Sequence, residues 1–149
     1  MSMSYHLHAS LMYQLTLTSR LQERRLEDGL RALGLTRLTW CILLAVHVEG
    51  YSQPSDIAQF IGVDRTATSR ALRQMEQRGW VARSTGRDDR RTTRVELTPA
   101  GVDLLTRAVP VAEDNAHHFL SKLTPEETEA LQRIMANLRL GEAHNLQHF

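Results

Sequence analysis

Apolar and polar residues in the first part of the chain alternate with the period of an amphipathic α-helix. Leucines recur three or four residues apart at positions 7–15 and 26–33, and charged residues lie between these two groups. No proline interrupts residues 5–33, and Gly34 is a typical residue to end a helix. The pattern predicts one helix of about 29 residues over positions 5–33. Because a small monomer cannot bury such a helix along its whole length, we expect part of its apolar stripe to meet another chain.

A second helix is predicted from Thr36 as N-cap to Glu49, closed by Gly50. Residues 38–46 are apolar on almost every side of this helix, which is typical of a helix in the middle of a core.

Two further helices follow between Ser52 and Gly79. Ser52 is the predicted N-cap of the first, which carries proline in its first turn and ends at Gly62. Asp64 begins the second, whose apolar positions recur at i, i+3, i+4 and i+7. These inward residues are Thr68, Ala71, Leu72 and Met75. Helix, short turn and helix at this spacing predict a helix-turn-helix unit.

After Gly79 the apolar period changes to two, which indicates strands at residues 80–85 and 92–97. A polar, arginine-rich tip at residues 86–91 separates them. The two helices and this β-hairpin together predict a winged helix-turn-helix.

The remaining sequence is helical in pattern. Thr98-Pro99 begins a helix whose apolar stripe reaches Leu123, with a kink expected at Pro110. Thr124 to Glu127 has the form of a capping box that opens a last helix, before a polar tail at 141–149. We therefore predict a mainly α fold with a small β-hairpin wing and about six helices. Residues 35–98 form its winged helix-turn-helix DNA-binding lobe, and residues 1–34 and 99–149 form its helical dimerisation region, in a single intertwined domain.

Composition limits the class of protein. No run approaches the roughly 18 apolar residues of a membrane-spanning helix, which excludes an integral membrane protein. The first ten residues lack the pattern of a secretory signal, so we expect a cytoplasmic protein. Cys41 is the only cysteine and leaves no internal disulfide framework.

The distribution of charge adds to the picture. The net charge is only +1, but residues 64–94 hold nine arginines against four acids, a net +5, which leaves −4 for the rest of the chain. A basic segment on a mildly acidic body favours a polyanion-binding face.

The ordered motifs between residues 35 and 105 resemble those of the MarR family of bacterial transcriptional regulators. They are Leu35-Thr36 with Trp40, Ser55-Asp56-Ile57-Ala58, Ile61-Gly62-Val63-Asp64, Asp64-Arg65-Thr66-Ala67-Thr68-Ser69-Arg70, Glu76-Gln77-Arg78-Gly79-Trp80-Val81, Asp88-Asp89-Arg90-Arg91 and Val95-Glu96-Leu97-Thr98-Pro99-Ala100-Gly101. The resemblance implies a homodimer on pseudo-palindromic double-stranded DNA, usually a repressor, often released by a small aromatic or anionic effector.

The predicted recognition helix has a small, polar face backed by cations, as a helix in the major groove requires. Its expected DNA contacts are Arg65, Thr66, Ala67, Ser69, Arg70 and Arg73, joined by Ser52 and Gln53 at phosphate. Arginine also suits the strongly negative minor groove. In the wing, Arg91 matches the family's wing-tip arginine and is expected in that groove, with Arg87 and Arg90 at phosphates. Asp89 is expected to orient an arginine within the tip or to hold the wing against its own domain.

The effector, if present, is expected near Tyr13, Trp40 and His47, with Arg20 facing a carboxylate. No cofactor or metal is expected. Cys41 lies among apolar neighbours, where a thiol is unreactive. The candidate metal ligands are His47, Glu113, His117 and His118. The adjacent His117 and His118 point about 100° apart on a helix, which disfavours their binding one metal ion. The alternatives are a metal- or oxidant-sensing member of the same family and a winged-helix protein-interaction module. The arginine face, four arginines if Arg78 is counted, disfavours the module. No nucleophile or phosphate-loop motif supports an enzyme.

Overall fold

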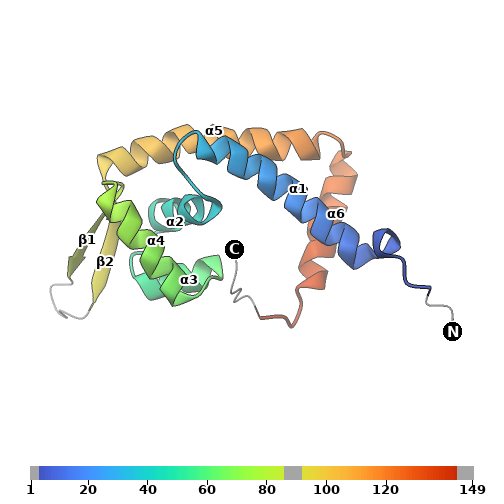
Figure 1. Ribbon diagram of the computed structural model, residues 1–149, viewed down its shortest axis with the longest axis horizontal. Coiled ribbons are helices and arrows are strands. Elements are labelled where there is room, and N and C mark those ends of the chain that lie inside the picture. The colour runs from blue at the N-terminus through green and yellow to red at the C-terminus, as the bar shows by residue number, and fades with distance from the viewer. Residues whose placement is uncertain (1–3, 86–91, 144–149) are drawn as a thin grey trace.

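The computed structural model describes residues 4–85 and 92–143. Within them α1 and α5 lie side by side along the molecule, α2–α4 and the hairpin gather beneath one end of α5, and α6 turns away at the other end (Figure 1). The elements are η1 (Leu7–Ala9), α1 (Leu11–Arg31), α2 (Arg37–His47), α3 (Pro54–Ile61), α4 (Arg65–Gln77), β1 (Val81–Thr85), β2 (Thr93–Leu97), α5 (Pro99–Leu120) and α6 (Pro125–Leu138). We call α2–α4, β1 and β2 the lobe, and α1, α5 and α6 the stalk. The predicted fold class is confirmed.

The first helix is shorter than predicted. Residues 7–9 form a separate 3₁₀ turn, and Ser10 adopts an extended conformation with φ −72° and ψ 124°. The Ser10 hydroxyl accepts the Tyr13 N–H at 3.4 Å and starts α1 at Leu11. The leucine repeat concealed this break, because a cap changes the backbone without changing the apolar period. The helix ends at Arg31, two residues earlier than predicted, but Gly34 closes it as expected: it has φ +76°, and the Leu35 N–H donates to the Leu30 carbonyl.

The second helix lies at the centre of the hydrophobic core, as predicted. Ile42, Leu43 and Ala45 are fully buried and belong to one cluster with Leu30 of α1. The cluster also takes Leu72 and Met75 from α4, Val81 and Val95 from the hairpin, and Leu104, Leu105 and Ala108 from α5. Thr36 and Thr39 form a capping box at the start of α2. The helix ends at His47, two residues earlier than predicted.

The helix-turn-helix forms as predicted, except at its first cap. Asp64 accepts the Ala67 N–H at 2.8 Å and begins α4, and the four inward residues of α4 are buried. Ser52 is not the N-cap of α3. The N-cap is Gln53, whose side chain makes no capping hydrogen bond. The first carbonyl bonded within the helix is that of Gln53, and the Ser52 carbonyl instead accepts the Val95 N–H at 2.8 Å. This bond holds the start of α3 against β2.

The hairpin pairs β1 and β2 in antiparallel register, from Val81 opposite Leu97 to Thr85 opposite Thr93. It joins α5 at a tight contact: a Cβ on Gly101 would lie 2.1 Å from the Trp80 carbonyl oxygen, so glycine is required there. α5 continues as one helix through Pro110, and α6 begins at the predicted capping box of Thr124 and Glu127. None of the helices in the described part of the chain is long and apolar enough to cross a membrane.

Candidate nucleic-acid interface

The outward face of α4 carries the predicted recognition residues. Thr66, Arg65, Arg70 and Arg73 are exposed, and Ala67 and Ser69 are half-buried at the edge of the same face. The three arginines make no hydrogen bond or ion pair with any residue in 4–85 or 92–143, so within that range their guanidinium groups remain available for an external anion.

A fourth arginine, Arg78 at the C-terminal end of α4, points away from this face. The Arg78 Nη1 donates to the Gly34 carbonyl at 3.2 Å, and its guanidinium lies 5.0 Å from the centre of the Trp80 ring. Arg78 therefore holds the end of α4 against the α1–α2 loop and does not belong to the arginine face. The sequence left open whether Arg78 is counted with that face, because it does not reveal that the chain after Gly79 brings Trp80 beneath this side chain.

A polar groove adjoins the arginine face. It has a volume of about 320 Å³ and lies between the start of α3, the first turns of α4 and the start of β2. Its lining residues are Gln53, Pro54, Ser55, Arg65, Ser69, Thr92 and Thr93. The groove thus brings together three predicted contacts that are up to 16 positions apart in sequence, Gln53, Arg65 and Ser69.

The start of α3 offers backbone donors at this groove. Pro54, the first residue of the helix, has no N–H, and no side chain caps α3, so the first-turn amides of Ser55 and Asp56 have no partner within the helix. Ser55, Thr92 and Thr93 were not predicted as site residues. They are ordinary polar residues whose only distinguishing property is where the fold places them.

The wing is described only in part. Arg87, Asp89, Arg90 and Arg91 lie outside the described residues. Of the arginines in the strands, Arg94 is exposed, whereas the Arg83 Nε lies 3.5 Å from a Glu76 carboxylate oxygen and ties β1 to α4.

The four candidate effector residues do not come together within one chain. The start of α1 lies at the end of that helix far from α2 (Figure 1). Tyr13 lies in this first turn and packs edge-on against His8, with ring centres 5.1 Å apart. Trp40 is buried in the core, whereas Arg20 and His47 are exposed.

Cys41 lies on α2 in a partly buried position. Burial raises the pKa of its thiol from 9.0 to about 11, an effect that the positive charge of Arg37 partly offsets. No group of three or more histidine, cysteine or acidic side chains suited to a metal ion occurs among residues 4–85 and 92–143.

The stalk exposes a broad apolar surface. Along α1 the exposed apolar residues include Leu11, Leu15 and Leu21, and along α6 they include Ile134 and Leu138. Between α1, α5 and α6 these helices enclose an open groove of about 610 Å³, lined mainly by apolar residues such as Leu21, Leu120 and Leu131. Surfaces of this kind on a small protein mark an interaction site.

A helix-turn-helix with a hairpin wing, an arginine face and a polar groove on the same side define a winged-helix DNA-binding protein. Residues 33–92 match the model of the MarR family. The chain is 30% identical over 140 residues to the transcriptional repressor MprA of Escherichia coli K12, covering 88% of this chain and 80% of the relative. The chain belongs to the MarR family.

Solved structures share this fold at low identity. BpsR of Bordetella bronchiseptica, whose DNA binding is regulated by 6-hydroxynicotinic acid, superposes with a TM-score of 0.84 at 21% identity, over 94% of this chain and all of the other. A mutant of MarR from Escherichia coli complexed with operator DNA superposes with a TM-score of 0.81 at 21% identity, over 92% of this chain and 99% of the other.

Proposed function

We propose that this chain is a homodimeric transcriptional repressor that acts in the cytoplasm on pseudo-palindromic operators in duplex DNA. The observation that carries the proposal is the set of three arginines on α4, without partners among the described residues, beside a polar groove. Membership of the MarR family, whose members are transcriptional regulators and not enzymes, supports the same function.

In this proposal α4 enters the major groove, which is about 12 Å wide and accepts one helix. Arg65 or Arg70 pairs with the O6 and N7 atoms of guanine, and Thr66 and Ala67 lie against thymine methyl groups. Arg73 contacts phosphate.

The start of α3 binds the DNA backbone in the same proposal. Phosphate is held by the Ser55 and Asp56 amides with the Ser52 and Gln53 side chains. In the wing, Arg91 enters the minor groove and Arg87 and Arg90 meet phosphates, while Asp89 orients one of these arginines.

The stalk supplies the two-fold interface. Its exposed leucines on α1 and its α6 face suit a surface that meets its own copy around a symmetry axis. Two lobes held by such an interface would face successive turns of the same side of a duplex, about 34 Å apart. The effector is proposed to be a small aromatic or anionic molecule, in keeping with the regulation of BpsR by 6-hydroxynicotinic acid. Since its candidate contacts are separated in one chain, its site would need both protomers or other residues.

The proposal is tested by selecting duplexes from a randomised library with the purified protein. We expect an inverted repeat whose half-sites are centred one helical turn apart, bound by a dimer, with an affinity that falls steeply with salt. Failure to enrich any duplex at low ionic strength would reject DNA binding and favour the protein-interaction module.

A further inference from the structure

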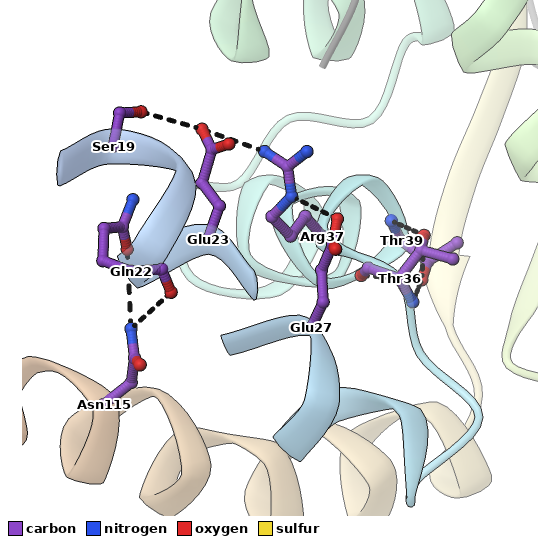
Figure 2. A network of polar contacts seen from close by, with 8 residues as sticks. All are labelled: Ser19, Gln22, Glu23, Glu27, Thr36, Arg37, Thr39 and Asn115. Carbon is purple, nitrogen blue, oxygen red and sulfur yellow. Dashed lines mark hydrogen bonds and ion pairs between the residues drawn. The ribbon is translucent and has the colours of Figure 1, made fainter. Parts of the chain in front are cut away.

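The first residue of α2 joins the lobe to the stalk through two carboxylates (Figure 2). The Arg37 Nε donates to a Glu27 carboxylate oxygen at 2.7 Å, and its Nη1 lies 3.2 Å from a Glu23 carboxylate oxygen. Glu23 and Glu27 are one turn apart on α1, on the side that faces α2. We call these three residues the Arg37 clamp.

The three members of the clamp compensate charges that α1 and α2 place unfavourably. A cation in the first turn of a helix opposes the helix dipole, and α2 has no acid of its own there. Two carboxylates four residues apart on one helix repel each other. With Arg37 between them, Glu23 and Glu27 pair with the same cation, which offsets their mutual repulsion.

The clamp is also more enclosed than the other ion pairs. The Arg37 side chain is 19% exposed, whereas every other ion-paired arginine of the described residues is at least 29% exposed. The Ser19 hydroxyl donates to Glu23 at 3.2 Å and orients it (Figure 2). The net stability from an ion pair that is partly removed from water is small, because the desolvation of both charges offsets their attraction.

The clamp acts against a fixed framework. On the other side of α1, the buried Asn115 of α5 donates to the Gln22 carbonyl at 3.4 Å, and Arg25 pairs with Asp114 at 2.9 Å. These contacts hold α1 to α5 within the stalk. Among residues 4–85 and 92–143, the clamp provides the only ion pairs that join the stalk to the lobe.

We infer that Arg37 is a positioning residue that sets the orientation of the lobe on the stalk, and thereby the half-site spacing that the dimer accepts. The inference rests on the proposed function. Each base pair inserted between half-sites moves them about 3.4 Å apart and turns one relative to the other by about 34°. A lobe with a fixed orientation therefore tolerates one spacing, and a lobe released at the junction with α1 tolerates several.

The test uses the full-length protein and a set of duplexes with the selected half-sites and spacers shortened or lengthened by one and two base pairs. Affinity is measured by fluorescence anisotropy for the parent protein, R37A, R37K, E23Q and E27Q. R31A is the matched control, because Arg31 makes only an exposed ion pair within α1.

We expect the parent to prefer one spacing by at least about tenfold. R37A should lower that preference at least about threefold, by losing affinity at the preferred spacing while keeping it at the others. R37K, which cannot reach both carboxylates in the same way, should lie between, and R31A should match the parent.

An unchanged spacing profile in R37A, or an equal loss on every duplex, would overturn the inference. If R37A does not fold, as judged by circular dichroism, E23Q and E27Q provide the test. Each should lower the spacing preference about twofold. A parent protein that binds as a dimer without any spacing preference would also overturn the inference, because its lobes would then not be held in one orientation. A parent protein that binds every duplex as a monomer would instead reject the proposed dimeric function, whatever the variants do.

Discussion

The guanidinium of Arg78 lies over the ring of Trp80, 5.0 Å from its centre, and donates to the Gly34 carbonyl. One side chain thus connects the end of the recognition helix, the start of the wing and the loop between α1 and α2. For Arg78→Ala we expect a loss of about 1 kcal/mol in the free energy of unfolding, measured in urea, from the lost cation–π contact and hydrogen bond. The salt dependence of DNA binding should stay unchanged, and a reduced slope would place Arg78 at phosphate instead.

Arg70→Ala should affect specificity. Its guanidinium is exposed on α4, without a partner among the described residues, so its loss should cost about 1–3 kcal/mol on the selected duplex and relax the preference at one base position in each half-site. Repeating the library selection with the variant measures this effect. The same base preference in parent and variant would exclude Arg70 from base reading.

Arg91→Ala should behave differently. Arg91 lies outside the described residues and is predicted to act through charge in the minor groove. Its loss should weaken binding on all sequences alike and reduce the slope of log affinity against log salt by about one. A titration over several salt concentrations, with the Arg70 variant beside it, separates the two roles.

Gly101 and Gly29 form a natural pair for testing close packing. A Cβ at Gly101 would meet the Trp80 backbone oxygen at 2.1 Å, whereas a Cβ at Gly29 would meet a methyl group of Val111 at 2.6 Å. Because a side chain yields more easily than a backbone, Gly101→Ala should cost about 3 kcal/mol or more and Gly29→Ala about 1 kcal/mol. Equal losses in thermal or urea unfolding would contradict the assigned contacts.

Ile134→Glu should dissociate the dimer. Ile134 is 51% exposed in the single chain, so a carboxylate there leaves the fold of the protomer intact but is costly once a partner covers it. Analytical ultracentrifugation should show a monomer, with circular dichroism unchanged, and Gln132→Glu, at another exposed position on α6, provides the control. A stable Ile134→Glu dimer would place the two-fold interface elsewhere.

Cys41 should react slowly. With its pKa raised from 9.0 to about 11, its thiolate fraction at pH 8 is about a hundredfold lower in the folded than in the unfolded chain. Alkylation by iodoacetamide should therefore be slow in buffer and fast in urea. Because the folded state holds this proton more tightly, its contribution to stability is complete below about pH 9 and is lost as the pH rises toward 11. Rapid alkylation of the native protein would revive the oxidant-sensing alternative.

The sequence predicted most of the fold where a local signal decides the structure. The caps at Thr36, Asp64 and Thr124 and the inward stripe of α4 are short-range features, and the structure has them as predicted. One error was local, because the Ser10 cap breaks the predicted first helix without changing its apolar period. Elsewhere a distant partner decides: Ser52 is engaged by Val95, and Arg78 is held by Trp80 and Gly34. The groove beside α4 depends on three separate segments meeting, so residues such as Thr93 had no signal of their own.

The apolar face of α6 has a further consequence. An isolated protomer leaves apolar side chains such as Leu138 exposed to water. Dimerisation buries them, so the free energy of association adds to the free energy of unfolding. The thermal midpoint of this protein should then rise with its own concentration. Dilution alone would return it toward a state that exposes these helices, which makes cellular abundance a determinant of how much functional regulator exists.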